Sequence, residues 1–133
     1  MDTGRIDELG ALFTEDAVCQ FGTFGTWEGR ETIRENFAQV DRDLHHGVPF
    51  HAVHSNSDHW IDFTGPDTAI GRGYLIDMVT EKAPDEIPIV VIGVYDEEYR
   101  KVEGAWKIAR CTLQFLWPDK QVSSNFEEPF GAD

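Results

Sequence analysis

The 133-residue sequence predicts an α+β domain in which a curved antiparallel β-sheet wraps around N-terminal helices. Two observations support this fold class. Apolar residues recur at helical spacing in two segments before residue 45, and the chain from residue 50 to residue 117 reads as four long strands separated by turns. A sheet curled over its helices in this way leaves a cone-shaped cavity with one open end.

The N-terminal third predicts two helices with one short strand between them. Apolar positions at helical spacing indicate a first helix over Asp2 to Thr14 and a second from Glu31 to about Leu44. Ala17 to Phe21 reads as a short strand, and Gly22 to Thr26 as a loop. The sequence Gly47-Val48-Pro49 ends the second helix, because glycine and proline are stop signals.

The chain after residue 49 is expected to be β throughout. Ser57-Asp58 is a plausible bulge that divides the first strand, so that His59, Ile61 and Phe63 begin a new stripe on one face. Val102-Glu103-Gly104 makes a hairpin turn between the last two strands. The four strands are predicted over residues 50–63, 68–79, 87–99 and 105–117.

Composition excludes several classes of partner. Eleven Lys and Arg against 25 Asp and Glu give a formal charge of −14, which opposes phosphate backbones and anionic lipid. We therefore expect no nucleic acid and no membrane partner. Cys19 and Cys111 form no paired motif and need no disulfide, so a cytoplasmic location is the default. One domain is expected over residues 1–133, with an acidic C-terminal tail at residues 119–133.

His54 is the first candidate for chemistry. On an alternating strand it shares a face with Phe50, Ala52 and Asn56, whereas His51 points to the other face. Imidazole has an unperturbed pKa of about 6.5, close to working pH, so a His54 that faces a pocket is suited to act as a base. The alternative interpretation is a hydrogen-bonded histidine on a solvated sheet face.

Neither a metal nor a cofactor is expected. His51 and His54 point to opposite faces and cannot chelate together, and His45-His46 lie on a loop without an H-E-x-x-H motif or paired cysteines. The sequence also contains no G-x-G-x-x-G, P-loop or G-x-S-x-G motif. The expected chemistry is cofactor-free.

Four segments in order resemble one family over nearly the whole chain: L-F-T-E-D-A-V, W-E-G-R-E-T-I-R, G-P-D-T-A-I-G and Y-D-E-E-Y-R-K-V-E-G-A-W-K-I-A-R. The chain resembles the SnoaL-like branch of the nuclear transport factor 2-like superfamily, which implies a cystatin-like α+β barrel. Within it, F-G-T-F-G-T-W-E-G and A-V-H-S-N-S-D-H-W-I-D-F look like the dehydratase type, namely scytalone dehydratase, bile-acid 7-alpha-dehydratase and hexachlorocyclohexane dehydrochlorinase.

The resemblance also implies catalytic residues. The His–Asp pair of these enzymes falls on His54 and, counted back from E-D-A, on Asp2. The further pocket aspartate of the bile-acid enzyme falls on Asp77, and Arg110 is the nearest candidate for the pocket arginine of the dehydrochlorinase. The family's first helix usually starts earlier and brings a Tyr or Lys into the pocket, and this chain has no counterpart of that residue.

These residues suggest an elimination reaction. His54 would take a C–H proton, Asp2 would orient the imidazole, and Asp77 would protonate a departing hydroxyl if burial raised its pKa. Tyr74 is a second possible donor, but it lies on the opposite strand face from Asp77, so only one of the two can face the cavity without a bulge. The expected substrate contacts are Tyr74, Asn56, Arg110, Trp60 and Phe21.

The function predicted first is a cofactor-free lyase of the dehydratase or dehydrohalogenase type that acts on a small hydrophobic cyclic substrate. The alternatives are an isomerase or polyketide cyclase, in which Asp77 would be the base, and a non-catalytic ligand-binding module. Relatives of the dehydratase type assemble as trimers and others in the superfamily as dimers. We therefore expect a homo-oligomer, with a trimer favoured.

Overall fold

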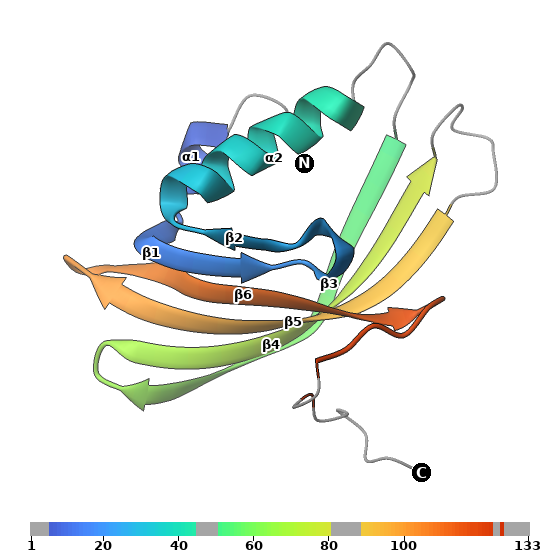
Figure 1. Ribbon diagram of the computed structural model, residues 1–133. Helices are drawn as coiled ribbons and strands as arrows, with labels where there is room; N and C mark the ends of the chain where they lie inside the picture. The colour runs from blue at the N-terminus through green and yellow to red at the C-terminus, as the bar shows by residue number, and fades with distance from the viewer. Residues whose placement is uncertain (1–5, 45–50, 81–88, 124–125, 127–133) are drawn as a thin grey trace.

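The computed structural model describes residues 6–44, 51–80, 89–123 and 126. Two α-helices, one short 3₁₀ helix and six strands lie in these ranges (Figure 1). In chain order they are α1 (Ile6–Gly10), β1 (Phe13–Gln20), η1 (Gly22–Phe24), β2 (Thr26–Glu28), α2 (Arg30–Leu44), β3 (His51–Gly65), β4 (Thr68–Thr80), β5 (Ile89–Val102) and β6 (Ala105–Trp117). Among the described helices, none is both long and apolar enough to cross a membrane.

The six strands form one curved sheet in the order β2-β1-β6-β5-β4-β3, and α1 and α2 lie over one face of it (Figure 1). We call this the concave face and the opposite one the convex face. The sheet is open, with β2 and β3 at its edges, and all neighbours are antiparallel except β1 and β6, which run parallel. The predicted α+β class is confirmed, although the parallel pair was not anticipated.

The first helix is shorter than predicted. α1 ends at Gly10, and Phe13 already pairs with Ile108 of β6, so the helix predicted over Asp2 to Thr14 was wrong at its C-terminal end. The reason is tertiary: Phe13 is buried in the core, and its carbonyl accepts a hydrogen bond from Arg30 Nε at 2.9 Å. The loop expected at Gly22 to Thr26 contains η1 and the start of β2.

Two local backbone features match the prediction. The β3–β4 register shifts between Ser57 and Trp60, and Asp58 has φ 50°, so the bulge predicted at Ser57-Asp58 is confirmed. The β5–β6 hairpin turns through Glu103 and Gly104, both with positive φ, as a two-residue turn of this kind requires. The bulge matters for function because it determines which face the side chains after Asp58 occupy.

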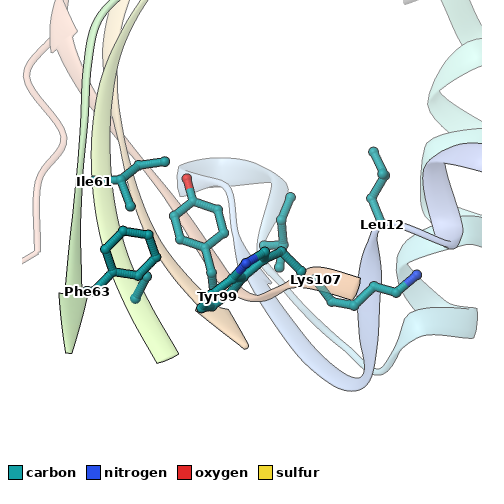
Figure 2. Close-up of a pocket in the computed structure, with 8 residues that line it drawn as sticks. Leu12, Ile61, Phe63, Tyr99 and Lys107 are labelled. Atoms are coloured by element: carbon teal, nitrogen blue, oxygen red, sulfur yellow. The ribbon is translucent and has the colours of Figure 1, made fainter. Parts of the chain in front are cut away.

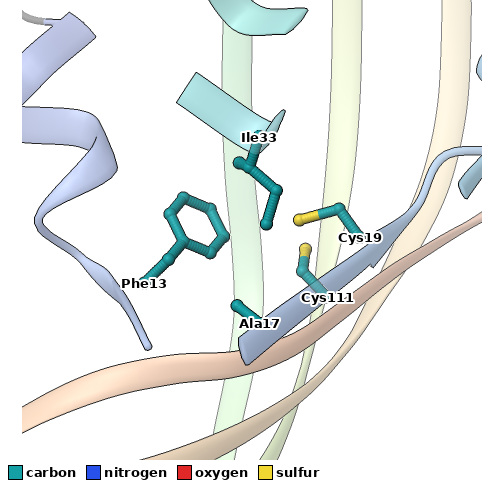
Figure 3. Close-up of a cluster of buried hydrophobic side chains, with 5 residues drawn as sticks. All are labelled: Phe13, Ala17, Cys19, Ile33 and Cys111. Atoms are coloured by element: carbon teal, nitrogen blue, oxygen red, sulfur yellow. The ribbon is translucent and has the colours of Figure 1, made fainter. Parts of the chain in front are cut away.

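The core lies between α2 and the β1–β6 part of the sheet. Phe13, Ala17, Cys19, Ile33 and Cys111 are buried together, with Ile33 of α2 pointing toward the strands (Figure 3). Cys19 and Cys111 are neighbours in register on β1 and β6, and both are free thiols.

Three aromatic rings pack against this core. Trp27 packs edge-on against Phe21 and Phe37, with ring centroids 5.0 and 5.2 Å apart. Such edge-to-face contacts favour a rigid wall. The open part of the concave face lies beyond these rings, over β3, β4 and β5.

The segment after β6 crosses the convex face. Gln121 pairs with Phe115, and the buried Gln114 side chain exchanges hydrogen bonds with Ser123 at 2.8 and 3.2 Å. The centroid of the Phe126 ring lies 5.2 Å from the Arg72 guanidinium, so Phe126 contacts the convex face of the sheet. The rest of the predicted acidic tail after Phe126 lies outside the described residues.

Candidate functional site

A cavity of about 350 Å³ lies between the concave face and α2. Aromatic rings form one wall, and polar side chains from the long strands form the other. We call this cavity the polar-lined pocket; its residues are Phe13, Phe21, Phe37, Asn56, His59, Gly73, Tyr95, Glu97, Ile108 and Cys111. An apolar body with a few convergent polar groups is the usual form of a small-molecule site.

A second cavity of similar volume adjoins the first at Ile108. It is lined almost entirely by apolar atoms from β3, β4, β5, β6 and from Leu12, which lies between α1 and β1 (Figure 2). Lys107 contributes its aliphatic stem, because its ammonium group donates to the carbonyl of Ala11. We call it the apolar pocket; its residues are Leu12, Ile61, Phe63, Ala69, Tyr99, Trp106, Lys107 and Ile108.

His54 and Asp77 form a pair across the β3–β4 ladder. They are register partners, and His54 Nε2 lies 3.0 Å from Asp77 Oδ1. The two atoms are close but lack the alignment of a full hydrogen bond. Asp77 Oδ1 is buried and accepts no aligned hydrogen bond within the described residues. Burial raises the pKa of Asp77, while the charge of His54 and its contact oppose that rise. The pair lies one step along β3 from Asn56, on the same face as the polar-lined pocket.

A second polar group lies inside the polar-lined pocket. The Tyr99 hydroxyl donates to Glu97 Oε2, and His59 Nε2 lies 3.1 Å from the Tyr99 oxygen and 3.7 Å from Glu97 Oε2. Cys111 Sγ donates to Glu97 Oε1 over 3.8 Å. The Glu97 side chain is only 17% exposed, so the pocket holds an acidic group that is largely withdrawn from water. We call Glu97, Tyr99 and His59 the Glu97 centre.

Two glycines of β4 make room for the Glu97 centre. A Cβ at Gly71 would come within 2.8 Å of the Tyr99 ring, and one at Gly73 within 3.3 Å of the His59 ring. Both rings therefore lie flat on a strand that presents no side chains at these positions. This is the physical reason for the I-G-R-G-Y sequence in β4.

The structure separates the predicted site residues into three groups. His54, Asp77, Asn56 and Phe21 all belong to the concave face, and the last two line the polar-lined pocket. Asp2 lies outside the described residues.

Tyr74, Trp60 and Arg110 lie on the convex face, so the structure does not bring them to the cavity as predicted. Strand alternation is the reason for Tyr74, since its neighbour Gly73 lines the pocket. Trp60 follows the bulge and is in register with Arg72, while Arg110 precedes Cys111 and lies 3.9 Å from Glu98. Between Asp77 and Tyr74, Asp77 is therefore the one on the concave face.

Sequence reasoning missed the Glu97 centre. Strand alternation predicts the stripe of His59 but no role for it, and Glu97 and Tyr99 fall at the end of the strand predicted over residues 87–99. The two glycines two residues apart in β4 were the available signal, because glycine inside a strand often marks close approach by another group. Within residues 6–44, 51–80, 89–123 and 126, no group of three or more His, Cys, Asp or Glu side chains is placed to hold a metal ion.

A model of the SnoaL-like domain family matches residues 1–112. The chain belongs to the SnoaL-like family. The resemblance to this family that the sequence suggested is thereby confirmed. Structural neighbours described as having a cystatin-like fold agree with the observed α+β class. No curated protein matches this SnoaL-like chain significantly.

Solved structures similar to the SnoaL-like chain include three from Novosphingobium. A candidate aromatic ring hydroxylase of N. aromaticivorans is 33% identical, with a TM-score of 0.68 over 85% of this chain and 76% of that one. A candidate scytalone dehydratase of the same species is 22% identical, with a TM-score of 0.72 over 99% and 85%. The hexachlorocyclohexane dehydrochlorinase LinA-type3 of N. barchaimii is 20% identical, with a TM-score of 0.71 over 96% and 84%.

Together, the family match and the structural neighbours show a SnoaL-like domain with this fold. At identities near 20%, the likeness to the dehydratase and the dehydrochlorinase concerns the fold alone.

Proposed function

We propose that this SnoaL-like protein is a cofactor-free lyase that removes water or HX from a small hydrophobic cyclic substrate. The observation that carries the proposal is the His54–Asp77 pair, with Nε2 and Oδ1 3.0 Å apart on the face that bears an aromatic cavity. A base held by a carboxylate next to an apolar pocket is the arrangement that proton abstraction from carbon requires.

In the proposed reaction, His54 takes the proton from carbon. Because Nε2 faces Asp77, Nδ1 is the nitrogen left to accept it. The C–H bonding electrons form the new double bond, and the leaving group departs from the adjacent carbon with its own bonding pair. Asp77 then stabilises the imidazolium, a role that the sequence had suggested for Asp2.

The substrate class follows from the cavity walls. Phe13, Phe21 and Phe37 offer apolar ring faces, and a volume of about 350 Å³ lies at the lower end of the range for small-molecule sites. A single or fused ring with one or two polar substituents fits such a space. The fold likeness to a candidate dehydratase and to a dehydrochlorinase supports the same reaction class.

A second candidate is an isomerase in which Asp77 moves the proton. The raised pKa of Asp77, caused mainly by burial, favours this alternative because it brings a carboxylate closer to the pH at which it can both take and return a proton. In that case Asp77→Asn reduces turnover more than His54→Ala. The lyase predicts the reverse order, because Asp77 acts there only through His54.

The test is a product screen with the purified protein. Cyclic alcohols and cyclic halides are incubated with it, and products are identified by mass. Loss of water or of HX supports the lyase, while a product of unchanged mass with a shifted double bond supports the isomerase. Ligand binding without either product contradicts both and leaves a binding module.

We also propose that the protein is a homo-oligomer. Val53, Trp60, Ile70, Ile76 and Met78 are large apolar side chains exposed on the convex face of β3 and β4. β3 is moreover a long edge strand, and such edges are usually covered. A second copy of the chain over this face would bury both features.

A further inference from the structure

The Glu97 centre has no part in the proton abstraction assigned to His54, yet it is the most polar feature of the polar-lined pocket. His59 and Glu97 both line that pocket, and Tyr99 connects them. Tyr99 also lines the apolar pocket (Figure 2). Through the hydroxyl of Tyr99, the Glu97 centre connects residues of both cavities.

The direction of each hydrogen bond follows from the chemistry of the groups. Tyr99 donates to Glu97, and both burial and this bond raise the pKa of Tyr99, which keeps the phenol protonated. Since the only Tyr99 proton goes to Glu97, the Tyr99 oxygen accepts from His59 Nε2, 3.1 Å away. The chain of donors therefore runs from His59 through Tyr99 to the Glu97 carboxylate.

The second oxygen of Glu97 is the less well satisfied one. Oε2 receives the Tyr99 hydroxyl, whereas Oε1 receives, from the part of the chain that the structure describes, the Cys111 thiol alone over 3.8 Å. A thiol is a weak donor, and a hydroxyl bound to a carboxylate would approach to about 2.5–2.7 Å. A ligand hydroxyl at Oε1 would therefore replace a weak contact with a strong one.

We propose that the Glu97 centre binds a hydroxyl group of a ring-bearing ligand, with Glu97 Oε1 as acceptor. The inference deepens the proposed function, since it rests on the same cavity holding the substrate, and it selects hydroxylated over halogenated rings. A carbon-bound halide has no proton to donate, and its partial negative charge faces a carboxylate. The site thus favours cyclic alcohols or phenols as ligands.

A ligand cation is the competing choice for a buried carboxylate, and the geometry argues against it. Two donors already lie beside Glu97 Oε2, the Tyr99 hydroxyl and His59 Nε2 at 3.7 Å. A cation would lose its hydration in this largely aromatic cavity and would find Oε1 as its acceptor. A neutral hydroxyl loses much less hydration energy.

Binding of matched naphthalenes tests the proposal without any turnover. We would measure Kd by NMR titration for 1-naphthol, 1-methylnaphthalene, 1-chloronaphthalene and 1-naphthylmethylammonium with the full-length protein. We expect 1-naphthol to bind about tenfold more tightly than the methyl and chloro compounds, the scale of one hydrogen bond to a charged group. Equal affinities, or tightest binding of the ammonium compound, would overturn the proposal.

Two variants locate the effect. Glu97→Gln should reduce the naphthol preference to less than about threefold, whereas Glu98→Gln, the neighbouring exposed acid on the convex face, should retain it. A full preference in Glu97→Gln contradicts the proposal. If Glu97→Gln does not fold, the wild-type comparison of the four naphthalenes still decides. A preference for 1-naphthol without turnover in the product screen would refute the proposed lyase but not the hydroxyl-binding site. Turnover without a preference for 1-naphthol would refute the hydroxyl-binding site but not the lyase.

Discussion

His54 and Asp77 face each other across the β3–β4 ladder, with Nε2 of the imidazole 3.0 Å from Oδ1 of the carboxylate. The two residues are 23 positions apart in sequence, and antiparallel pairing brings them into register. The carboxylate is the more buried partner, with its side chain 24% exposed against 41% for His54. His54 is thus the more exposed partner of the pair, on the same face as Asn56 of the polar-lined pocket.

The pH dependence of stability should identify Asp77 as a destabilising group. Burial raises its pKa, so the folded chain binds this proton more tightly than the unfolded chain does. Stability from this group is therefore lost as pH rises from the usual aspartate value of about 4 through the raised folded value. Asp77→Asn mimics the protonated form, and its stability relative to wild type should increase over that window and then level off.

Urea unfolding of wild type and Asp77→Asn between pH 3 and pH 8 measures this difference. Asp67→Asn, at the exposed β3–β4 turn, is the control and should show no such rise. If the stability of Asp77→Asn relative to wild type instead falls as pH rises, the interaction with His54 lowers the pKa of Asp77 more than burial raises it.

Gly71→Ala should disturb the Glu97 centre. The new methyl group would lie within 2.8 Å of the Tyr99 ring and 3.1 Å of the Trp60 carbonyl, so either the ring or the strand must move. Overpacking of this kind costs about 1–3 kcal/mol of unfolding free energy. Gly73→Ala, whose nearest contact is 3.3 Å from the His59 ring, should cost less. Thermal and urea unfolding check the order; a larger loss in Gly73→Ala would contradict the packing described for the two glycines.

Ile33 should be the most sensitive contact between α2 and the sheet. Its side chain is fully buried against Phe13 and Cys19 at the centre of the core (Figure 3). Ile33→Ala should lower the unfolding free energy by about 2–5 kcal/mol, and Ile33→Val by about 0.5–1.5 kcal/mol. Losses below 0.5 kcal/mol in both variants, measured in urea, would show that α2 is not anchored here.

The convex face should set the oligomeric state. Ile76 is exposed in the single chain, so a charge at this position would disfavour burial against a second copy. Light scattering should show an oligomer for wild type and a smaller species for Ile76→Lys. Asp67→Asn changes the net charge by the same amount and should leave the oligomer intact. A monomeric wild type would refute the proposal.

Local pattern predicted much of the architecture correctly. The bulge at Ser57-Asp58 and the turn at Glu103-Gly104 follow from strand and turn chemistry, and strand alternation correctly grouped His54 with Asn56 on one face. The same alternation placed Tyr74 and Asp77 on opposite faces before the structure showed which one faces inward.

Non-local packing determined what the sequence did not predict. Phe13 continues a helical apolar pattern, yet pairing with Ile108 of β6 draws it into a strand. Glu97 and Tyr99 lie near the end of an apolar run, and only the register between β4 and β5 shows that they lie beside Gly71 on the concave face. Trp60 and Arg110 were assigned to the pocket by type and resemblance, but the register places them on the other face.

Turnover of His54→Ala is the most direct test of the proposed chemistry. With the best substrate from the product screen, kcat/KM should fall at least about 100-fold, the scale of a lost general base, while the unfolding midpoint stays near that of wild type. Ser55→Ala, on the opposite face of the same strand, should keep wild-type turnover. A folded His54→Ala protein with wild-type kcat/KM would contradict the assignment of His54 as the base.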